Sequence, residues 1–187
     1  MSTTNIKPSR GKLLIAEPVL DSVYFKKSVI LITDYNDEGS VGFVLNKKID
    51  AFLKDVITDI KSDKFQLFVG GPVAKDSLFF IHNKGELIKN STSIGNNLYW
   101  GGDFDSIKKF INSGKLTEDD IKFFVGYSGW DANQLERELE EETWIISDFE
   151  KAQALSYRSE DMWRDALKKL GGDFSLLINY PDDPTLN

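Results

Sequence analysis

The pattern of apolar residues limits the possible folds of this chain most strongly. Several short runs rich in Val, Ile and Leu are bounded by turn-forming residues, which is typical of buried β-strands. These runs lie at residues 13–16, 28–33, 41–45, 66–69, 78–81, 121–127 and 144–146. The turn-forming residues 36–39 separate the second run from the third and predict a β-hairpin, because Gly39 can adopt a positive φ.

Other segments have the spacing of helices with one buried face. They lie at residues 51–60, 103–114, 131–142 and 159–171. In the third segment, Asp131 is followed three residues later by Gln134, which approximates a capping box. Because strands and helices do not alternate regularly, the pattern favours an α+β fold over a doubly wound sheet.

Nothing in the sequence divides the chain into two domains. Its 187 residues can bury a core, and they contain no repeat, low-complexity tract or Pro/Ser/Gly-rich linker. We expect a flexible N-terminal arm at residues 1–10, a single domain at 11–177 and a loose C-terminal tail at 178–187. No apolar stretch approaches the roughly 18 residues of a transmembrane helix, and no apolar segment follows the first basic residues. A cytoplasmic protein without a membrane partner is therefore expected.

The distribution of charge argues against direct binding of nucleic acid. The net charge is −7, and residues 131–161 carry 10 acidic and 3 basic side chains. Such a surface repels phosphates unless a local basic patch overrides its field. The glutamate-rich run 136–142 has two interpretations, a solvated helix face or an acidic docking surface for a basic partner.

The numbers of Cys and His residues exclude several kinds of catalytic site. The chain has no Cys and a single His, His82, so disulfides, thiolate metal sites and multi-His metal sites cannot form. Ser128 lies in a Gly-Tyr-Ser-Gly-Trp sequence, in which Trp130 occupies the position where a nucleophile elbow requires glycine. A triad of Ser128, His82 and a carboxylate stays formally possible. The alternative is a hydrogen-bonded structural His82 and a serine in a tight turn.

The sequence predicts no metal site and no cofactor. Residues 34–39 resemble the first half of a calcium loop, but Leu45 stands where a bidentate carboxylate is required. The glycine-rich turns at 70–72 and 100–102 lack the spacing of dinucleotide-binding and phosphate-binding loops. Their glycines are better explained by sharp chain reversals or close backbone packing.

Six segments together resemble the ordered motifs of the YqgE/AlgH family of bacterial proteins. They are GKLLIAEP (11–18), KSVILI (27–32), EGSVGFVLNK (38–47), LFVGGPV (67–73), LFFIH (78–82) and VGYSGWDANQLERELEEETWI (125–145). The resemblance runs from residue 11 to about residue 172. It implies a compact α+β domain whose mixed, mostly antiparallel sheet is curled into a barrel-like form with peripheral helices. It also implies a connection with transcriptional regulation, without a mechanism.

Ser128 and several residues that match the family's signature are candidates for a binding groove. The candidates are Asn46, Gly70, Gly71, Pro72, His82, Tyr127, Ser128, Gly129, Trp130, Gln134 and Glu138. The chain departs from the family at residues 131–133, which replace Gly-Pro-Gly, and at Lys47 and Lys48, which replace Arg-Pro. Lysine carries a point charge rather than a planar fork, so no bidentate contact is expected there.

Three hypotheses about function follow. The first is a non-enzymatic regulatory or adaptor protein that binds an unknown protein partner or a small ligand, because a catalytic constellation is missing and the surface is acidic. The second is a hydrolase that uses Ser128 or a carboxylate with His82. The third, direct DNA binding, has the least support because no helix-turn-helix signature is present. It would use Lys7, Arg10, Lys12, Lys26, Lys27, Lys47 and Lys48.

Overall fold

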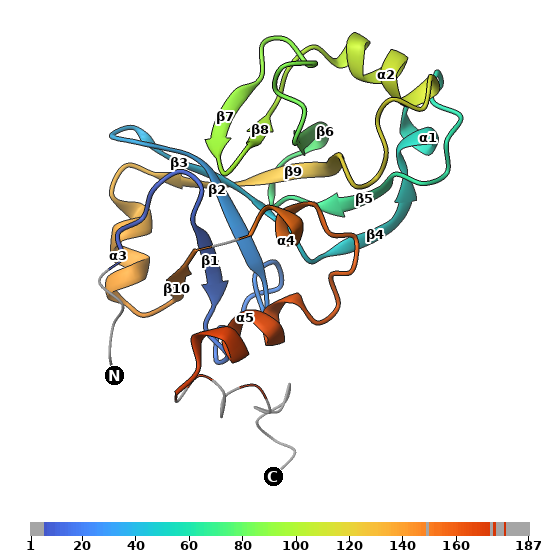
Figure 1. Cartoon of the computed structure of the whole chain (residues 1–187). Helices are drawn as coiled ribbons and strands as arrows, with labels where there is room; N and C mark the ends of the chain where they lie inside the picture. Colours follow the sequence, from blue (N-terminus) through green and yellow to red (C-terminus); the bar gives the residue numbers. More distant parts are fainter. Residues whose placement is uncertain (1–5, 149, 173, 175–177, 179–187) are drawn as a thin grey trace.

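Strands and helices follow one another irregularly along the chain, as the apolar pattern predicts. The computed structural model describes residues 6–148, 150–172, 174 and 178 (Figure 1). Its strands are β1 (Leu13–Ala16), β2 (Val29–Asn36), β3 (Gly39–Val44), β4 (Lys48–Phe52), β5 (Gln66–Val69), β6 (Val73–His82), β7 (Thr92–Gly95), β8 (Leu98–Trp100), β9 (Ile121–Asp131) and β10 (Trp144–Ser147). Its helices are α1 (Leu53–Val56), α2 (Phe104–Asn112), α3 (Gln134–Glu140), α4 (Lys151–Leu155) and α5 (Met162–Leu170).

The strands form one curled, ten-stranded sheet. The main path runs β10-β1-β2-β3-β9-β6-β8-β7, and β5 joins β4 to β9. Only β5 and β9 pair in parallel; all other pairs in the described residues are antiparallel. At the two ends of the path, β10 and β7 each pair with one strand, so the curl does not close into a barrel (Figure 1). The α+β class and the mostly antiparallel sheet are confirmed.

The long strand β9 is shared by two halves of the sheet. Its first part pairs with β5 and β6, whereas residues 128–131 pair with β3. β3 and β9 therefore separate before the first part of β9. Gly70, directly after β5, lies between the two strands where they separate and bonds to both. The N–H of Gly70 donates to the carbonyl of Val125 at 2.9 Å, and its carbonyl accepts the N–H of Val44 at 3.0 Å.

Glycines allow the chain to cross β9 after Gly70. β5 and β6 lie on opposite sides of β9, so the short connection 70–72 must pass over it. A Cβ atom at Gly70 would lie 2.1 Å from the carbonyl oxygen of Gly126. Gly126 has a φ of +71°, and a Cβ atom there would lie 2.7 Å from the carbonyl oxygens of both Gly71 and Val73. Close backbone packing, one of the two explanations offered for these glycines, is what the structure shows.

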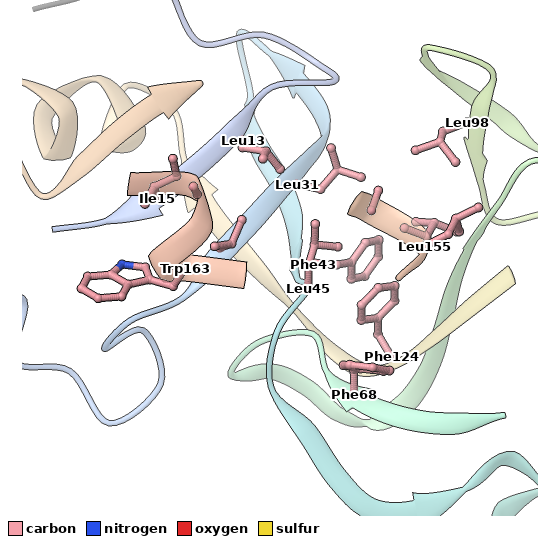
Figure 2. Packing of buried hydrophobic residues seen from close by; sticks show 14 of the residues in the cluster. Leu13, Ile15, Leu31, Phe43, Leu45, Phe68, Leu98, Phe124, Leu155 and Trp163 are labelled. Carbon is pink, nitrogen blue, oxygen red and sulfur yellow. The ribbon is translucent and has the colours of Figure 1, made fainter. Parts of the chain in front are cut away.

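Many strands are buried on both faces of the sheet, which explains why they appear in the sequence as unbroken apolar runs. In β1, Leu13 and Ile15 point into the curl, and the residues that alternate with them pack against its outer face. The inner cluster also contains Phe43 of β3 and Phe124 of β9, whose rings stack with centroids 4.9 Å apart (Figure 2). The core is thus the interior of the curl.

Helices cover the remaining surfaces of the sheet. α3 packs Leu135 against the outer face of β1 to β3, and α2 packs Ile107 against the outer face of β5, β6 and β9. α4 and α5 close the inner side with Leu155 and Trp163 (Figures 1 and 2). The indole N–H of Trp163 donates to the carbonyl of Ala16 at 2.8 Å. Among the described residues, no helix has both the length and the apolar character needed to cross a bilayer.

Several elements differ from the sequence prediction. The helix expected at 131–142 is shorter, because Asn133 adopts a left-handed conformation immediately before α3. The buried helical stripe expected at 51–60 is wrong, since β4 continues through Phe52 and Val56 of α1 is 54% exposed. β7 and β8 were not predicted, because they are short and β7 buries only one side chain.

The chain ends are described only in part. Residues 1–5 of the expected arm lie outside the described residues, as does the expected tail at 178–187 apart from Ile178. Ile6 packs against the outer cluster beside α3, and Arg10 forms an ion pair with Asp34.

Replacement of Gly126 by Ala is expected to destabilise the protein by about 3 kcal/mol, because it adds crowding against two carbonyl oxygens to a left-handed backbone. Gly114→Ala is the matched control. Gly114 has a φ of +73° and no atom within 4 Å of its Cβ position, so this change should cost only about 1 kcal/mol. Urea unfolding of both variants measures the difference. If both lose the same free energy of unfolding, the backbone crossing at Gly126 is not tightly packed.

Candidate binding groove

The candidate site residues do not share one groove. His82 lies near one end of the ladder between β6 and β9, opposite Ile121, which is seven residues before Ser128 on β9. At about 3.3 Å per strand residue, His82 and Ser128 are roughly 20 Å apart. The pair needed for the hydrolase hypothesis is therefore not assembled.

The ring of His82 is used in internal hydrogen bonds. Its side chain is fully buried, Nε2 lies 3.1 Å from the carbonyl oxygen of Gly101, and Nδ1 accepts the N–H of Lys84 at 3.2 Å. These partners select the neutral tautomer with its proton on Nε2. Burial lowers the pKa of His82, which also favours the neutral ring. The ring stacks on Tyr99 and has no free nitrogen for a substrate.

Ser128 supports the backbone crossing described above. It is fully buried, and its hydroxyl donates to the carbonyl of Gly70 at 3.0 Å. Gly71 and Pro72 continue from Gly70 across β9, so these four candidates do lie together. With its hydroxyl directed at a backbone carbonyl inside the protein, Ser128 is not placed as an accessible nucleophile.

Asn46 and Glu138 fix the ends of secondary-structure elements. The side-chain oxygen of Asn46 accepts the N–H of Val29 at 2.9 Å, and its amide donates to the carbonyl of Lys27 at 2.8 Å. These bonds hold the start of β2. Glu138 of α3 accepts the indole N–H groups of both Trp130 and Trp144, at 2.8 and 2.7 Å.

Gln134 links α3 to the end of β9. Its side-chain oxygen accepts the N–H of Asp131 at 3.0 Å, and its amide donates to Glu138 at 2.8 Å. The sequence prediction of a capping interaction between residues 131 and 134 thus has a structural counterpart, although the helix itself begins at Gln134.

Three of the candidates line an open groove of about 350 Å³ on the sheet formed by β2, β3 and β9. They are Tyr127, Gly129 and Trp130. The lining residues are Asp34, Asn36, Glu38, Gly39, Ser40, Val41, Val73, Tyr127, Gly129, Trp130 and Asp131. We call this set the hairpin groove, because much of it belongs to the hairpin between β2 and β3. A larger hollow of about 470 Å³ between α4 and α5 contains none of the candidates.

Glycines create the floor of the hairpin groove. Strand pairing places Asp34, Val41 and Gly129 in one row across the sheet. The next row contains Asn36, Gly39 and Asp131. Since side chains of paired residues share a face, this face carries carboxylate and amide side chains around the two glycines. A Cβ atom at Gly129 would lie 3.1 Å from the Tyr127 ring and one at Gly39 would lie 2.2 Å from the carbonyl oxygen of Trp130, so neither position has room for a larger residue.

The two ends of the hairpin groove differ in polarity. At one end the ring of Tyr127 lies beside Gly129, where a Cβ atom would be 3.1 Å from the ring, and Val73 stands next to it. At the other end are Glu38 and Asp131, both exposed and without an ion-pair partner in the described residues. Asp34 is paired with Arg10.

The arrangement suits a cationic group on an apolar stem. A Lys or Arg side chain can lay its methylene groups along apolar surface while its charged end reaches carboxylates, and a tyrosine face also attracts cations. The described residues contain no cluster of three or more His, Cys, Asp or Glu side chains that could hold a metal ion.

The carboxylates of this groove were missed as site residues. In the sequence, Asp34 and Glu38 fall in the calcium-like segment 34–39 and Asp131 falls at a predicted helix cap, so none of the three is predicted as a site residue. The signal that could have found them is the pairing of this hairpin with the strand that contains Tyr127 and Gly129.

Sequence reasoning also missed Lys122, which is fully buried near the start of β9, directly before an apolar run. Its ammonium donates to the carbonyls of Leu45 and Ser156, at 2.7 and 2.6 Å, and lies 3.9 Å from the centre of the Phe68 ring. No carboxylate pairs with it in the described residues. Burial, followed by the charge of Lys48, holds the pKa of Lys122 well below its ordinary value of 10.5.

Lys122 should give the protein a stability that rises with pH. Because its pKa is lower in the folded than in the unfolded protein, the unfolded chain binds more protons between these two values. The free energy of unfolding should therefore increase as the pH rises toward 10, and Lys122→Met should lack this increase. Urea unfolding of both proteins at pH 7, 8 and 9, below the ordinary tyrosine pKa of about 10, measures the difference. Parallel curves would contradict the lowered pKa of Lys122.

Three of the seven basic residues proposed for DNA binding form ion pairs within the protein. Arg10, Lys12 and Lys48 form ion pairs with Asp34, Asp148 and Glu160. Their charge is therefore partly neutralised within the protein, which gives the DNA-binding hypothesis no structural support.

Comparisons with known proteins all point to one family. The family model described as AlgH-like matches residues 13–175. A UPF0301 protein of Cytophaga hutchinsonii is 44% identical over 96% of this chain and 99% of its own length. A UPF0301 protein of Bacteroides thetaiotaomicron is 42% identical over 100% of this chain and 95% of its own.

Two solved structures share the fold. The solution structure of AlgH from Pseudomonas aeruginosa is 26% identical, with a TM-score of 0.72 over 95% of this chain and 100% of that chain. The crystal structure of a Corynebacterium diphtheriae protein is 22% identical, with a TM-score of 0.78 over 94% of both chains. The sequence matches and the shared fold agree, and the chain belongs to the AlgH-like family.

Proposed function

We propose that this protein is a non-catalytic regulatory or adaptor protein of the cytoplasm that binds a cationic part of a protein partner in the hairpin groove. The observation that carries the proposal is the pair of exposed carboxylates, Glu38 and Asp131, at one end of a hollow whose other end is formed by Tyr127 and Val73.

The electrostatic field of the surrounding surface supports this choice of partner. α3 follows the groove directly in the chain and carries most of the glutamate-rich run. A negative surface around a groove concentrates positively charged partners and increases their rate of association. The same field disfavours phosphate-rich partners, so regulation would act through protein contacts.

The burial of the former catalytic candidates also supports a binding role. Ser128 and His82 are both fully buried, lie far apart and direct their polar atoms at the backbone. Among the described residues, the hairpin groove contains no nucleophile activated by a neighbouring base. Its side chains are suited to binding a charged group rather than to catalysis.

The proposal predicts selective binding of a basic peptide. An octapeptide in which Lys and Thr alternate should bind and shift the amide NMR signals of Val41, Gly129 and Asp131, whereas a peptide of alternating Glu and Thr should not. Replacing Glu38 by Gln and Asp131 by Asn should weaken binding about fivefold, the effect of two exposed charges worth about 1 kcal/mol together. Added salt should weaken it further.

Asp63→Asn with Glu86→Gln is the matched control, because it removes the same charge from exposed positions in loops near the other end of β9. This double variant should bind the Lys/Thr peptide nearly as well as the unchanged protein. Equal weakening by both double variants would mean that only net charge matters. Failure of the basic peptide to bind at millimolar concentration would reject the groove as a cation site.

A further inference from the structure

We infer that the partner binds as an added β-strand along the free edge of β9, with a Lys or Arg side chain lying across the hairpin groove. This inference rests on the proposed function and specifies the backbone conformation of the partner. It concerns the stretch of β9 from Gly129 to Asp131.

Among the described residues, this stretch has a neighbouring strand on one side only. The ladder between β9 and β6 ends where Tyr127 pairs with Val73, whereas the ladder between β9 and β3 continues to Asp131. Beyond Tyr127, the side of β9 that faced β6 is therefore an open edge. Gly129 is exposed, and Val73 is 39% exposed at the end of β6.

The backbone groups of Gly129 point toward this open edge. The N–H of Val44 donates to Gly70, so alternate residues of β3, including Gly42, direct their backbone groups away from β2 and toward β9. Gly42 pairs with Ser128, and this pair therefore exchanges hydrogen bonds. In an antiparallel ladder the next pair does not, which leaves the N–H and carbonyl of Gly129 directed outward.

The end of β9 supports the same orientation. The N–H of Asp131, two residues after Gly129, donates to the side chain of Gln134 rather than to β3. Since residues two apart in a strand direct their backbone groups to the same side, this bond places Gly129 on the open side as well. α3 thus satisfies the N–H of Asp131 and leaves that of Gly129 for a partner.

Strand addition places a basic side chain over the groove. A residue opposite Gly129 projects its side chain to the face that carries Tyr127, Gly129 and Asp131. Its methylene groups can cross the floor formed by Gly129 and Gly39, and its charge can then reach Glu38 or Asp131. Main-chain hydrogen bonds would supply affinity and the groove would supply specificity, as in other cases of strand addition.

The charges on this edge argue against a second copy of the chain as the occupant. Since the open stretch is residues 129–131, antiparallel pairing of two copies about a twofold axis would set Asp131 of each copy opposite Gly129 of the other. The two Asp131 side chains would then be diagonal neighbours on one face, and like charges this close destabilise a strand pair. An extended basic segment of another protein has no such conflict.

Backbone N-methylation of the Lys/Thr octapeptide tests the inference separately from the proposed function. Residues opposite Gly129 in an antiparallel pair present both their side chain to the groove and their N–H to β9. N-methylation of every Lys should therefore weaken binding at least about tenfold, the loss expected for two hydrogen bonds, whereas N-methylation of every Thr should not. If only N-methylation of the Thr residues weakens binding, the partner strand would be parallel to β9 rather than antiparallel.

Further outcomes separate the two proposals. If both methylated peptides bind as the unmodified peptide does, or both fail, strand addition is overturned, although the groove still binds cations. If the unmodified peptide does not bind, the proposed function itself fails. With bound unmodified peptide, hydrogen exchange of the Gly129 amide should slow at least about tenfold. Sedimentation must show a monomer without peptide, since a dimer that protects this amide would make a second copy the occupant.

Discussion

The close contact between the backbone at Gly70 and the backbone of β9 is the constraint on which the rest of the structure depends. Where β3 and β9 separate, Gly70 accepts a hydrogen bond from one and donates to the other. The connection from β5 to β6 can then pass over β9 only because Gly71 and Gly126 carry no side chains. This single crossing joins both halves of the sheet and ends the β6 ladder beside the hairpin groove.

Much of the fold could be predicted from the sequence, because strands buried on both faces leave a strong signal. β1 is apolar at every position, the buried part of β2 is apolar except at Thr33, and each strand pairs with a neighbour on both sides. β7 could not be predicted, since Ile94 is its only buried residue and its strand character comes from pairing with β8. The left-handed Asn133 likewise shortened α3 in a way that residue type alone does not specify.

The candidate site was predictable only in part. The sequence pointed to Tyr127, Gly129 and Trp130, and these do line the hairpin groove. It could not show that His82 and Ser128 are fully buried, because burial depends on which distant segments cover a residue. The groove carboxylates could not be found from the sequence either. Glu38 comes near Asp131 only because its neighbour Gly39 pairs with Asp131 in the ladder between β3 and β9. Several of the motif residues stabilise the fold rather than line the groove. Glu138, for example, accepts hydrogen bonds from two indole N–H groups.

The buried ammonium of Lys122 has a consequence for the order of folding. It bonds to Leu45 and Ser156, which lie 77 and 34 residues away along the chain. A charged amine leaves water at reasonable cost only when its acceptors are in place. Ser156 follows β10 in the chain, so this second acceptor is synthesised only after all ten strands. The segment that contains α4 and α5 comes after β10, so it completes the polar surroundings of Lys122 in a sheet whose strands have already been synthesised.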